Sequence, residues 1–212
     1  MKLFCVKKGK KIKWLIHTGT HGDEFEVIDS VKRYIDKHKN KLPDFLWVPE
    51  VSPSAVVLKT RKNIRCLDIN RNFFEQCQDP EVKANLRLIK NKKFDLYISI
   101  HEDPTTEKFY LYDSADYSKT VSLKNLFRKI KSLGIELFEG LDDPDLDNII
   151  KNGYAIEDLK KGQISVYIKK HKIASRVLVP EIPGQIPKKL KDRVVEYIFQ
   201  YLLDIENRQL RI

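Results

Sequence analysis

Two histidines and one glutamate of this chain have the types and spacing of a metal site. His21 and Glu24 are three residues apart in "THGDE", a spacing that lets an imidazole and a carboxylate converge on one ion at the first turn of a helix. A zinc site with an open catalytic position needs three protein ligands of this kind. The third candidate is His101 in "DLYISIHED", after an apolar run that would hold it rigidly at a sheet edge. The His-x-x-Glu spacing alone is a weak signal, but two such histidines at two expected strand ends form a stronger one.

A glutamate in a late apolar segment is the candidate general base. Glu181 stands in "RVLVPEIPG", where a proline and a glycine would end the strand and turn the carboxylate toward the edge that carries the metal ligands. Such a glutamate can take a proton from water and pass it to a leaving amine. Glu102 and Asp103 are rival bases because they follow His101 directly. We rank Glu181 above them because consecutive residues on a strand point to opposite faces.

The elements that position these residues alternate between strands and helices. Short segments rich in β-branched and aromatic residues predict strands at 3–6, 13–17, 45–49, 95–101, 109–112 and 176–180. Apolar residues that recur every three or four positions predict helices at 24–39, 80–91, 118–133, 163–171 and 187–207. This alternation predicts an α/β fold with a mixed, largely parallel sheet and helices on both faces. Ligands in such folds bind at the carboxyl ends of the strands.

Length and composition predict one domain that spans residues 1–212, since this length with an ordinary apolar fraction can bury one sizeable core. No apolar run approaches the roughly 20 residues that span a bilayer. Most lysines of "MKLFCVKKGKKIKW" follow a short apolar segment and do not precede a long one, as they would in a secretory signal. We therefore expect a cytoplasmic protein with no membrane partner. Cys5, Cys66 and Cys77 are odd in number and lack a CxxC spacing, which predicts reduced, buried thiols.

The formal net charge of +10 does not by itself indicate nucleic acid. The lysines are spread over the chain among many acids, without a basic arm, so we expect no nucleic-acid partner. A lysine-rich surface is the simplest interpretation, and attraction of an anionic substrate is the alternative. The acidic run at 142–148 lacks the ligand pattern of a calcium loop, so a solvated loop is expected there.

Five short motifs resemble those of one enzyme family. In chain order they are "THGDE", "TRKN", "LDINRNF", "SIHED" and "PEIPG", and they follow the motifs of the zinc carboxypeptidases of the carboxypeptidase A-like family. The interval 61–70 also resembles the bacterial form "TRxNxxGVDLNRNF". The resemblance extends over residues 15–184, nearly the whole chain. It implies the zinc carboxypeptidase fold, of the phosphorylase/hydrolase-like type, and a zinc-dependent hydrolase.

The resemblance implies a zinc cofactor held by His21, Glu24 and His101. Asp68 in "LDINRNF" would orient a zinc-bound histidine, the usual role of a carboxylate behind an imidazole ligand. Zinc lowers the pKa of its bound water toward about 7. Glu181 stands in a Glu-x-Pro context similar to that of the family's catalytic glutamate, and it would take the proton of this water.

The resemblance also implies how a peptide would bind. Asn70 and Arg71 would hold the free carboxylate of the substrate, because a guanidinium matches a carboxylate with two parallel hydrogen bonds. Arg61 would stabilise the oxyanion that forms on the scissile carbonyl. Larger family members carry a tyrosine in a mobile loop before the catalytic glutamate, and here Tyr154 and Tyr167 are both candidates without a clear match.

The expected function is a metallocarboxypeptidase that removes the C-terminal residue of a peptide. An N-acyl amino acid deacylase of the succinylglutamate desuccinylase and aspartoacylase type is the alternative, since its "GTHGNE" and "DLNR" segments are similar to "GTHGDE" and "DINR". The "PEIPG" segment and Phe73 after "NRN" favour the carboxypeptidases. A third hypothesis is a catalytically inactive, zinc-free binding protein with the same fold. The complete set of ligands, base and electrophile argues against it.

Overall fold

An eight-stranded sheet forms the centre of the computed structural model, which describes residues 1–141, 149–156 and 161–209. Its strand order is β1-β3-β2-β4-β10-β6-β9, and β5 also pairs with β10. β1 and β6 run antiparallel to β3 and β10, and the other pairings are parallel. The predicted mixed, largely parallel sheet is therefore confirmed. The strands are β1 (Val6–Lys8), β2 (Trp14–His17), β3 (Phe45–Val48), β4 (Phe94–Ser99), β5 (His101–Asp103), β6 (Tyr110–Asp113), β9 (Tyr154–Ile156) and β10 (Ala174–Pro183).

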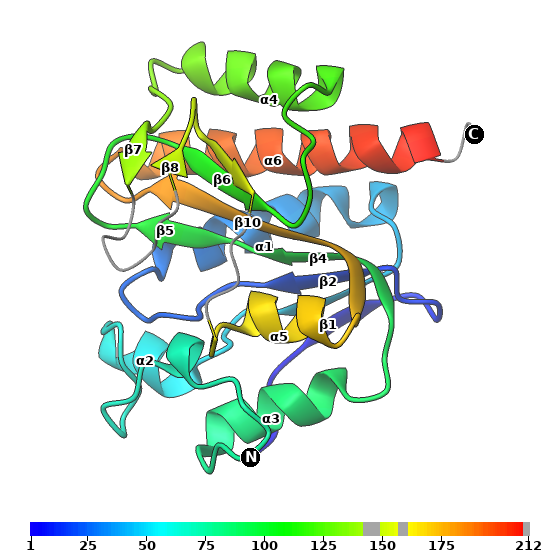
Figure 1. Cartoon of the computed structure of the whole chain (residues 1–212), viewed down its shortest axis with the longest axis vertical. Helices are drawn as coiled ribbons and strands as arrows, with labels where there is room; N and C mark the ends of the chain where they lie inside the picture. The colour runs from blue at the N-terminus through cyan, green and yellow to red at the C-terminus, as the bar shows by residue number, and fades with distance from the viewer. Residues whose placement is uncertain (142–148, 157–160, 210–212) are drawn as a thin grey trace.

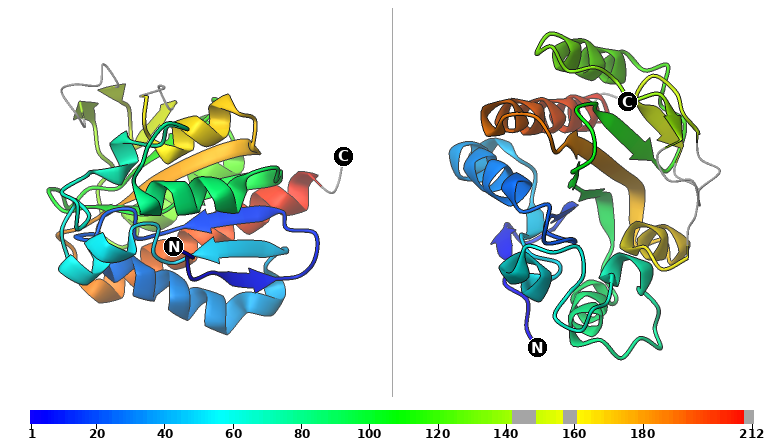
Figure 2. Two further views of the ribbon diagram at one scale, coloured as in Figure 1. Left: turned by 90° about the horizontal axis from the view of Figure 1, so that it is seen from below. Right: turned by 90° about the vertical axis from the view of Figure 1, so that its left-hand side faces the viewer.

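Helices cover both faces of this sheet, as predicted (Figure 1). One layer holds α1 (Glu26–His38), α4 (Val121–Lys131) and α6 (Lys188–Gln209), and α6 packs against both of the others. The opposite layer holds α3 (Pro80–Ile89) and α5 (Ile164–Lys170), with the short α2 (Pro53–Leu58) at its edge, and Figure 2 shows the two layers apart. The remaining elements are η1 (Lys39–Lys41), η2 (Ile69–Arg71) and a small ribbon of β7 (Gly140–Leu141) and β8 (Ile149–Ile150).

The apolar residues of the central strands divide between two cores. Trp14 and Ile16 of β2 belong to the core under α1 and α6, whereas Leu15 belongs to the core under α3 and α5. β2 and β3 are buried along their whole length, as expected for parallel strands with helices on both faces. In α1, Val27 and Val31 recur at a spacing of four and form the apolar stripe that faces the sheet. Neighbouring residues on a strand therefore face different helix layers.

The chain departs from the sequence predictions at several points. The strand expected at 3–6 begins only at Val6, where it pairs with Trp47, and Leu3 packs in a core instead. The cysteines are unpaired, but none is buried, and Cys66 is exposed. The run at 142–148 lies outside the described residues. Among the described helices, none is long and apolar enough to cross a membrane, in line with the absence of a long apolar run in the sequence.

Candidate active site

The turn between β2 and α1 carries two of the candidate ligands. A Cβ atom on Gly22 would lie 1.8 Å from the Ala55 carbonyl oxygen, so glycine lets the chain pass close to α2 directly after His21. The Gly22 N–H donates to the Thr60 carbonyl oxygen over 2.9 Å and fixes this approach. α1 begins at Glu26, so His21 and Glu24 lie in the turn before the helix. The prediction that they lie in the first turn of the helix was therefore wrong.

The side chains of His21, Glu24 and His101 converge in a buried cluster. Their donor atoms all lie within 4.8 Å of one another, and among the described residues no other group of three such side chains is close enough to hold an ion. Glu24 bridges the histidines: its Oε1 is 2.5 Å from His21 Nδ1, and its Oε2 is 2.8 Å from His101 Nδ1. Both Nδ1 atoms therefore face the same small volume as the carboxylate.

The outer nitrogen of each histidine has a partner of its own. His21 Nε2 lies 3.2 Å from Asp68 Oδ1, and His101 Nε2 lies 2.9 Å from Ser99 Oγ. An imidazole that binds a metal through one nitrogen commonly donates its other N–H to an oxygen, which fixes the ring. The arrangement therefore fits a divalent metal ion held through both Nδ1 atoms. Ser99 was missed from the sequence, although its position two residues before His101 puts it on the same strand face.

The charges of the cluster favour a cation. Burial alone would lower the pKa of His21, but Glu24 and Asp68 outweigh burial and raise it to about 9. Burial opposes ionisation of Glu24 as well, yet His101 and His21 hold its pKa far below the usual range. Asp68 is half-buried, and its contact with His21 and nearby Arg61 lowers its pKa to about 2. In the metal-free protein this negative field stabilises a protonated imidazole, and the same field would attract a metal ion.

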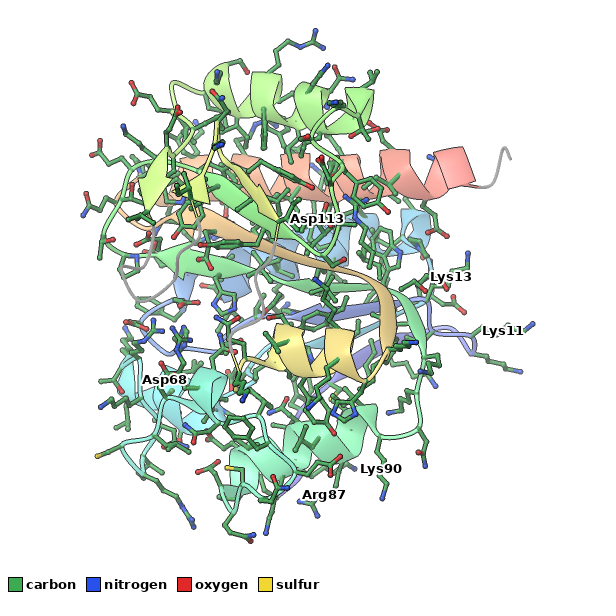
Figure 3. All side chains as sticks on the ribbon, viewed as in Figure 1. Lys11, Lys13, Asp68, Arg87, Lys90 and Asp113 are labelled. Carbon is green, nitrogen blue, oxygen red and sulfur yellow. The ribbon has the colours of Figure 1, made fainter. Side chains whose placement is uncertain are left out.

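A cavity of about 560 Å³ opens over this cluster. The other residues predicted for the site, Arg61, Asn70, Arg71 and Glu181, all line it. Glu181 on β10 is the direct neighbour of His101 on β5, so the two side chains project from the same face of the sheet. Figure 3 labels Asp68 on the side of the molecule opposite to Lys11 and Lys13, which precede β2. The cavity therefore lies at the carboxyl end of β2, as expected for an open α/β sheet.

The polar residues from the "LDINRNF" segment are fixed by local contacts. Asp68 caps η2 by accepting from the Asn70 N–H over 2.9 Å, and its other oxygen accepts from Arg61 Nε over 3.1 Å. The Asn70 side-chain oxygen accepts from the Ile164 N–H at the start of α5 over 3.2 Å. These contacts join η2 to the metal cluster on one side and to α5 on the other.

The rival bases differ in orientation. Glu102 also borders the cavity, but as the residue after His101 on β5 its side chain takes the opposite face, where its Oε2 lies 3.1 Å from Lys191 Nζ on α6. Asp103 lines the cavity, but it accepts from the Tyr110 hydroxyl over 2.8 Å and from the Thr105 hydroxyl over 2.6 Å. Both carboxylates thus have partners other than the three candidate ligands.

Neither tyrosine considered from the sequence lines this cavity. Tyr154 lies in β9, and its hydroxyl donates to the Ala115 carbonyl oxygen over 2.7 Å. Tyr167 lies against His171, with the ring centroids 4.2 Å apart, and lines a separate cavity beside α3. Tyr110 and Tyr112 on β6 line the active-site cavity instead. Sequence reasoning missed them, although their spacing of two places both on one face of the predicted strand.

Comparisons with known proteins agree with this arrangement. No family model and no curated protein sequence matches the chain. Among solved structures, a protein of Shewanella amazonensis SB2B assigned as a metallopeptidase matches with a TM-score of 0.78 at 16% identity, over 96% of this chain and 82% of that chain. A metallo-carboxypeptidase of Pseudomonas aeruginosa, solved with (2-guanidinoethylmercapto)succinic acid, matches with a TM-score of 0.60 at 16% identity, over 96% of this chain and 60% of that one. The chain has the fold of the metallo-carboxypeptidases.

A third similar structure belongs to an amidase. The murein-tripeptide amidase MpaA of Escherichia coli O157 matches with a TM-score of 0.56 at 17% identity, over 92% of this chain and 82% of that chain. The resemblance drawn from the five motifs is thus confirmed at the level of the fold. At these identities the solved structures establish the metallo-carboxypeptidase fold alone, so the reaction has to be argued from the residues of the cavity.

Proposed function

We propose that the chain is a zinc metallocarboxypeptidase that hydrolyses the C-terminal amide bond of a peptide, with residues 1–212 as one catalytic domain. The observation that carries the proposal is one cavity lined by the buried cluster His21, Glu24 and His101 together with Glu181 and Arg71. The metallo-carboxypeptidase fold of its structural neighbours supports a metal-dependent hydrolase. Two imidazoles and one carboxylate form a donor set that suits zinc with a further position open.

The residues divide the reaction among them. A bound zinc ion would polarise the scissile carbonyl and make water acidic enough to attack near neutral pH. Glu181 accepts the proton of the attacking water and returns it to the nitrogen of the leaving amino acid. Arg61 meets the negative charge that develops on the carbonyl oxygen. The cavity-facing Glu181 suits this role better than Glu102, whose carboxylate is paired with Lys191 on the other face.

The substrate is a peptide with a free C-terminal carboxylate. Asn70 and Arg71 lie beside the metal cluster in the cavity, and a guanidinium binds a carboxylate with charge-assisted hydrogen bonds. The Pseudomonas neighbour with a succinic acid derivative and the murein-tripeptide amidase support a substrate that carries carboxylate and peptide groups. A cytoplasmic location fits the three unpaired cysteines.

The test compares a free peptide acid with its C-terminal amide. The zinc-loaded protein should turn over the acid far faster, because a C-terminal amide offers the Arg71 guanidinium no anionic group to bind. Arg71→Ala should erase that preference, whereas Arg65→Ala, an exposed residue that does not line the cavity, should keep it. Equal turnover of acid and amide by the unaltered protein would exclude the carboxypeptidase.

The same screen separates the alternatives. It includes N-acyl amino acids, and their turnover without turnover of any peptide would indicate the deacylase. Less than one zinc ion per chain after purification in metal-replete buffer, without turnover of either substrate, would indicate a binding protein.

A further inference from the structure

A buried lysine lies directly behind the metal cluster, on the face of the sheet away from the cavity. Lys191 of α6 is only 3% exposed, although lysine is almost never buried unless it is paired. Its Nζ atom lies 2.5 Å from Glu26 Oε2 and 3.1 Å from Glu102 Oε2. Glu102 is itself 5% exposed, so the Lys191–Glu102 ion pair has little contact with water, whereas the Glu26 side chain is 37% exposed.

The two acids belong to the two segments that carry the metal ligands. Glu26 is the first residue of α1, two positions after Glu24, and Glu102 follows His101 on β5. The Glu102 N–H also points at Glu24 Oε2, at 3.4 Å. The lysine therefore joins the start of α1, directly after the turn that carries Glu24, to β5.

We propose that Lys191 is a positioning residue of the metal centre. By holding Glu26 and Glu102 together, it fixes the spacing between Glu24 and His101 and thereby sets the affinity for the metal. The inference rests on the proposed function for the location of the metal site. It goes beyond that function because Lys191 touches neither the cavity nor any of the three ligands.

Removal of the lysine has two effects on metal binding, and they differ in sign. Loss of a positive charge close to the cluster would by Coulomb's law make a cation bind more tightly. Loss of the link between the two segments would loosen the ligand geometry and weaken binding. Replacement of Lys191 by methionine, which has a similar length, therefore tests the proposal, because weaker binding cannot arise from the change in charge.

The measurement is the zinc dissociation constant, obtained by competition with a chelator of known affinity. Lys191→Met should bind zinc roughly 10-fold to 100-fold more weakly, the range found when partners behind metal ligands are replaced. Lys191→Arg keeps both ion pairs and should restore most of the affinity. Lys188→Met is the matched control, because Lys188 lies on the same helix and pairs with Asp192 and Ser30 near the surface. It should leave the zinc affinity unchanged.

A double variant that leaves the net charge unchanged tests the proposal independently if the single variant misfolds. Lys191→Met with Glu102→Met replaces the buried pair by apolar side chains, a change that proteins commonly tolerate better than the loss of one partner. The double variant should also bind zinc more weakly, and the visible spectrum of its cobalt(II) form should differ from that of the parent. A purely structural role would lower the thermal midpoint of the metal-free protein and leave the zinc affinity and the cobalt spectrum unchanged.

Two outcomes distinguish failure of this inference from failure of the proposed function. If Lys191→Met or the double variant binds zinc as tightly as the parent while His21→Ala does not bind it, the positioning role is wrong and the metal site stands. If His21→Ala and His101→Ala both retain full zinc, the metal site lies elsewhere and both proposals fail.

Discussion

Replacement of Asp68 by asparagine measures how much of the metal affinity depends on the carboxylate behind His21. Asp68 Oδ1 lies 3.2 Å from His21 Nε2, and Oδ2 accepts from Arg61 Nε over 3.1 Å. Asparagine keeps the size of the side chain but removes its charge. A hydrogen bond to a charged group contributes roughly 1.5–3 kcal/mol, and 1.4 kcal/mol corresponds to about a factor of ten in affinity. The zinc dissociation constant should therefore rise roughly 10-fold to 100-fold.

The assay is chelator competition on folded protein, with Asp79→Asn as the control. Asp79 is also buried and caps α3 by accepting from the Glu81 and Val82 N–H groups, but it does not line the cavity. Its replacement should lower the thermal midpoint and leave the zinc affinity unchanged. An unchanged affinity in Asp68→Asn, beside a loss of zinc in His21→Ala, would refute the role of Asp68 in orienting the histidine.

Four further predictions concern the metal, the base, the oxyanion and the alkaline limit. His21→Ala and His101→Ala should each lose zinc and activity together, measured by metal analysis and turnover on one sample. Glu181→Gln should keep its zinc and lose on the order of 10²- to 10⁴-fold in kcat, the usual share of a general base; near-parental turnover would exclude it as the base. Arg61→Ala should lower kcat by on the order of 10²-fold with little change in KM, as for loss of one oxyanion donor. Burial raises the pKa of Tyr201 to about 12 from 10.0, so its contribution to stability is present below about pH 10 and is lost as the pH rises toward 12. The alkaline fall in unfolding free energy, followed by urea titration, should be smaller by roughly 2–3 kcal/mol in Tyr201→Phe, and an equal fall would contradict this account.

The sequence predicted that His21 and His101 lie close together because two physical rules act on them. Apolar runs in "KWLIH" and "DLYISI" identify two buried parallel strands, and the carboxyl ends of such strands meet at one sheet edge. His21 and His101 each follow one of these runs, 80 positions apart in the chain. The parallel pairing of β2 with β4 brings the two histidines together, so their approach can be predicted without knowledge of other contacts.

Other parts of the fold depend on contacts that a single sequence does not specify. α2 has six residues and only Ala55 buried, so it lacks the apolar stripe that marks a helix, and its placement follows from the close approach of Gly22. β9 is three residues long and is recognisable only by its pairing with β6. Tyr154 was considered for the active site because larger members of the resembling family carry a tyrosine in a loop before the catalytic glutamate, and Tyr154 precedes Glu181. Its hydroxyl instead donates to the Ala115 carbonyl oxygen, in the bend that follows β6.

The pleat of β5 explains why neighbouring acids in "HED" have different partners. His101 shares a face with Ser99 and with Glu181 of the adjacent strand, which is the face of the cavity. Glu102 takes the opposite face, where α6 brings Lys191 against it. One residue of strand thus separates the face on which we propose proton exchange with the substrate from the face that is fixed by a buried ion pair. A carboxylate that must give up and regain a proton needs access to water, and a carboxylate that holds two segments together is better kept from it, because water screens the pair. Nearness to His101 in the sequence is therefore a poorer guide to the base than the parity of the strand position.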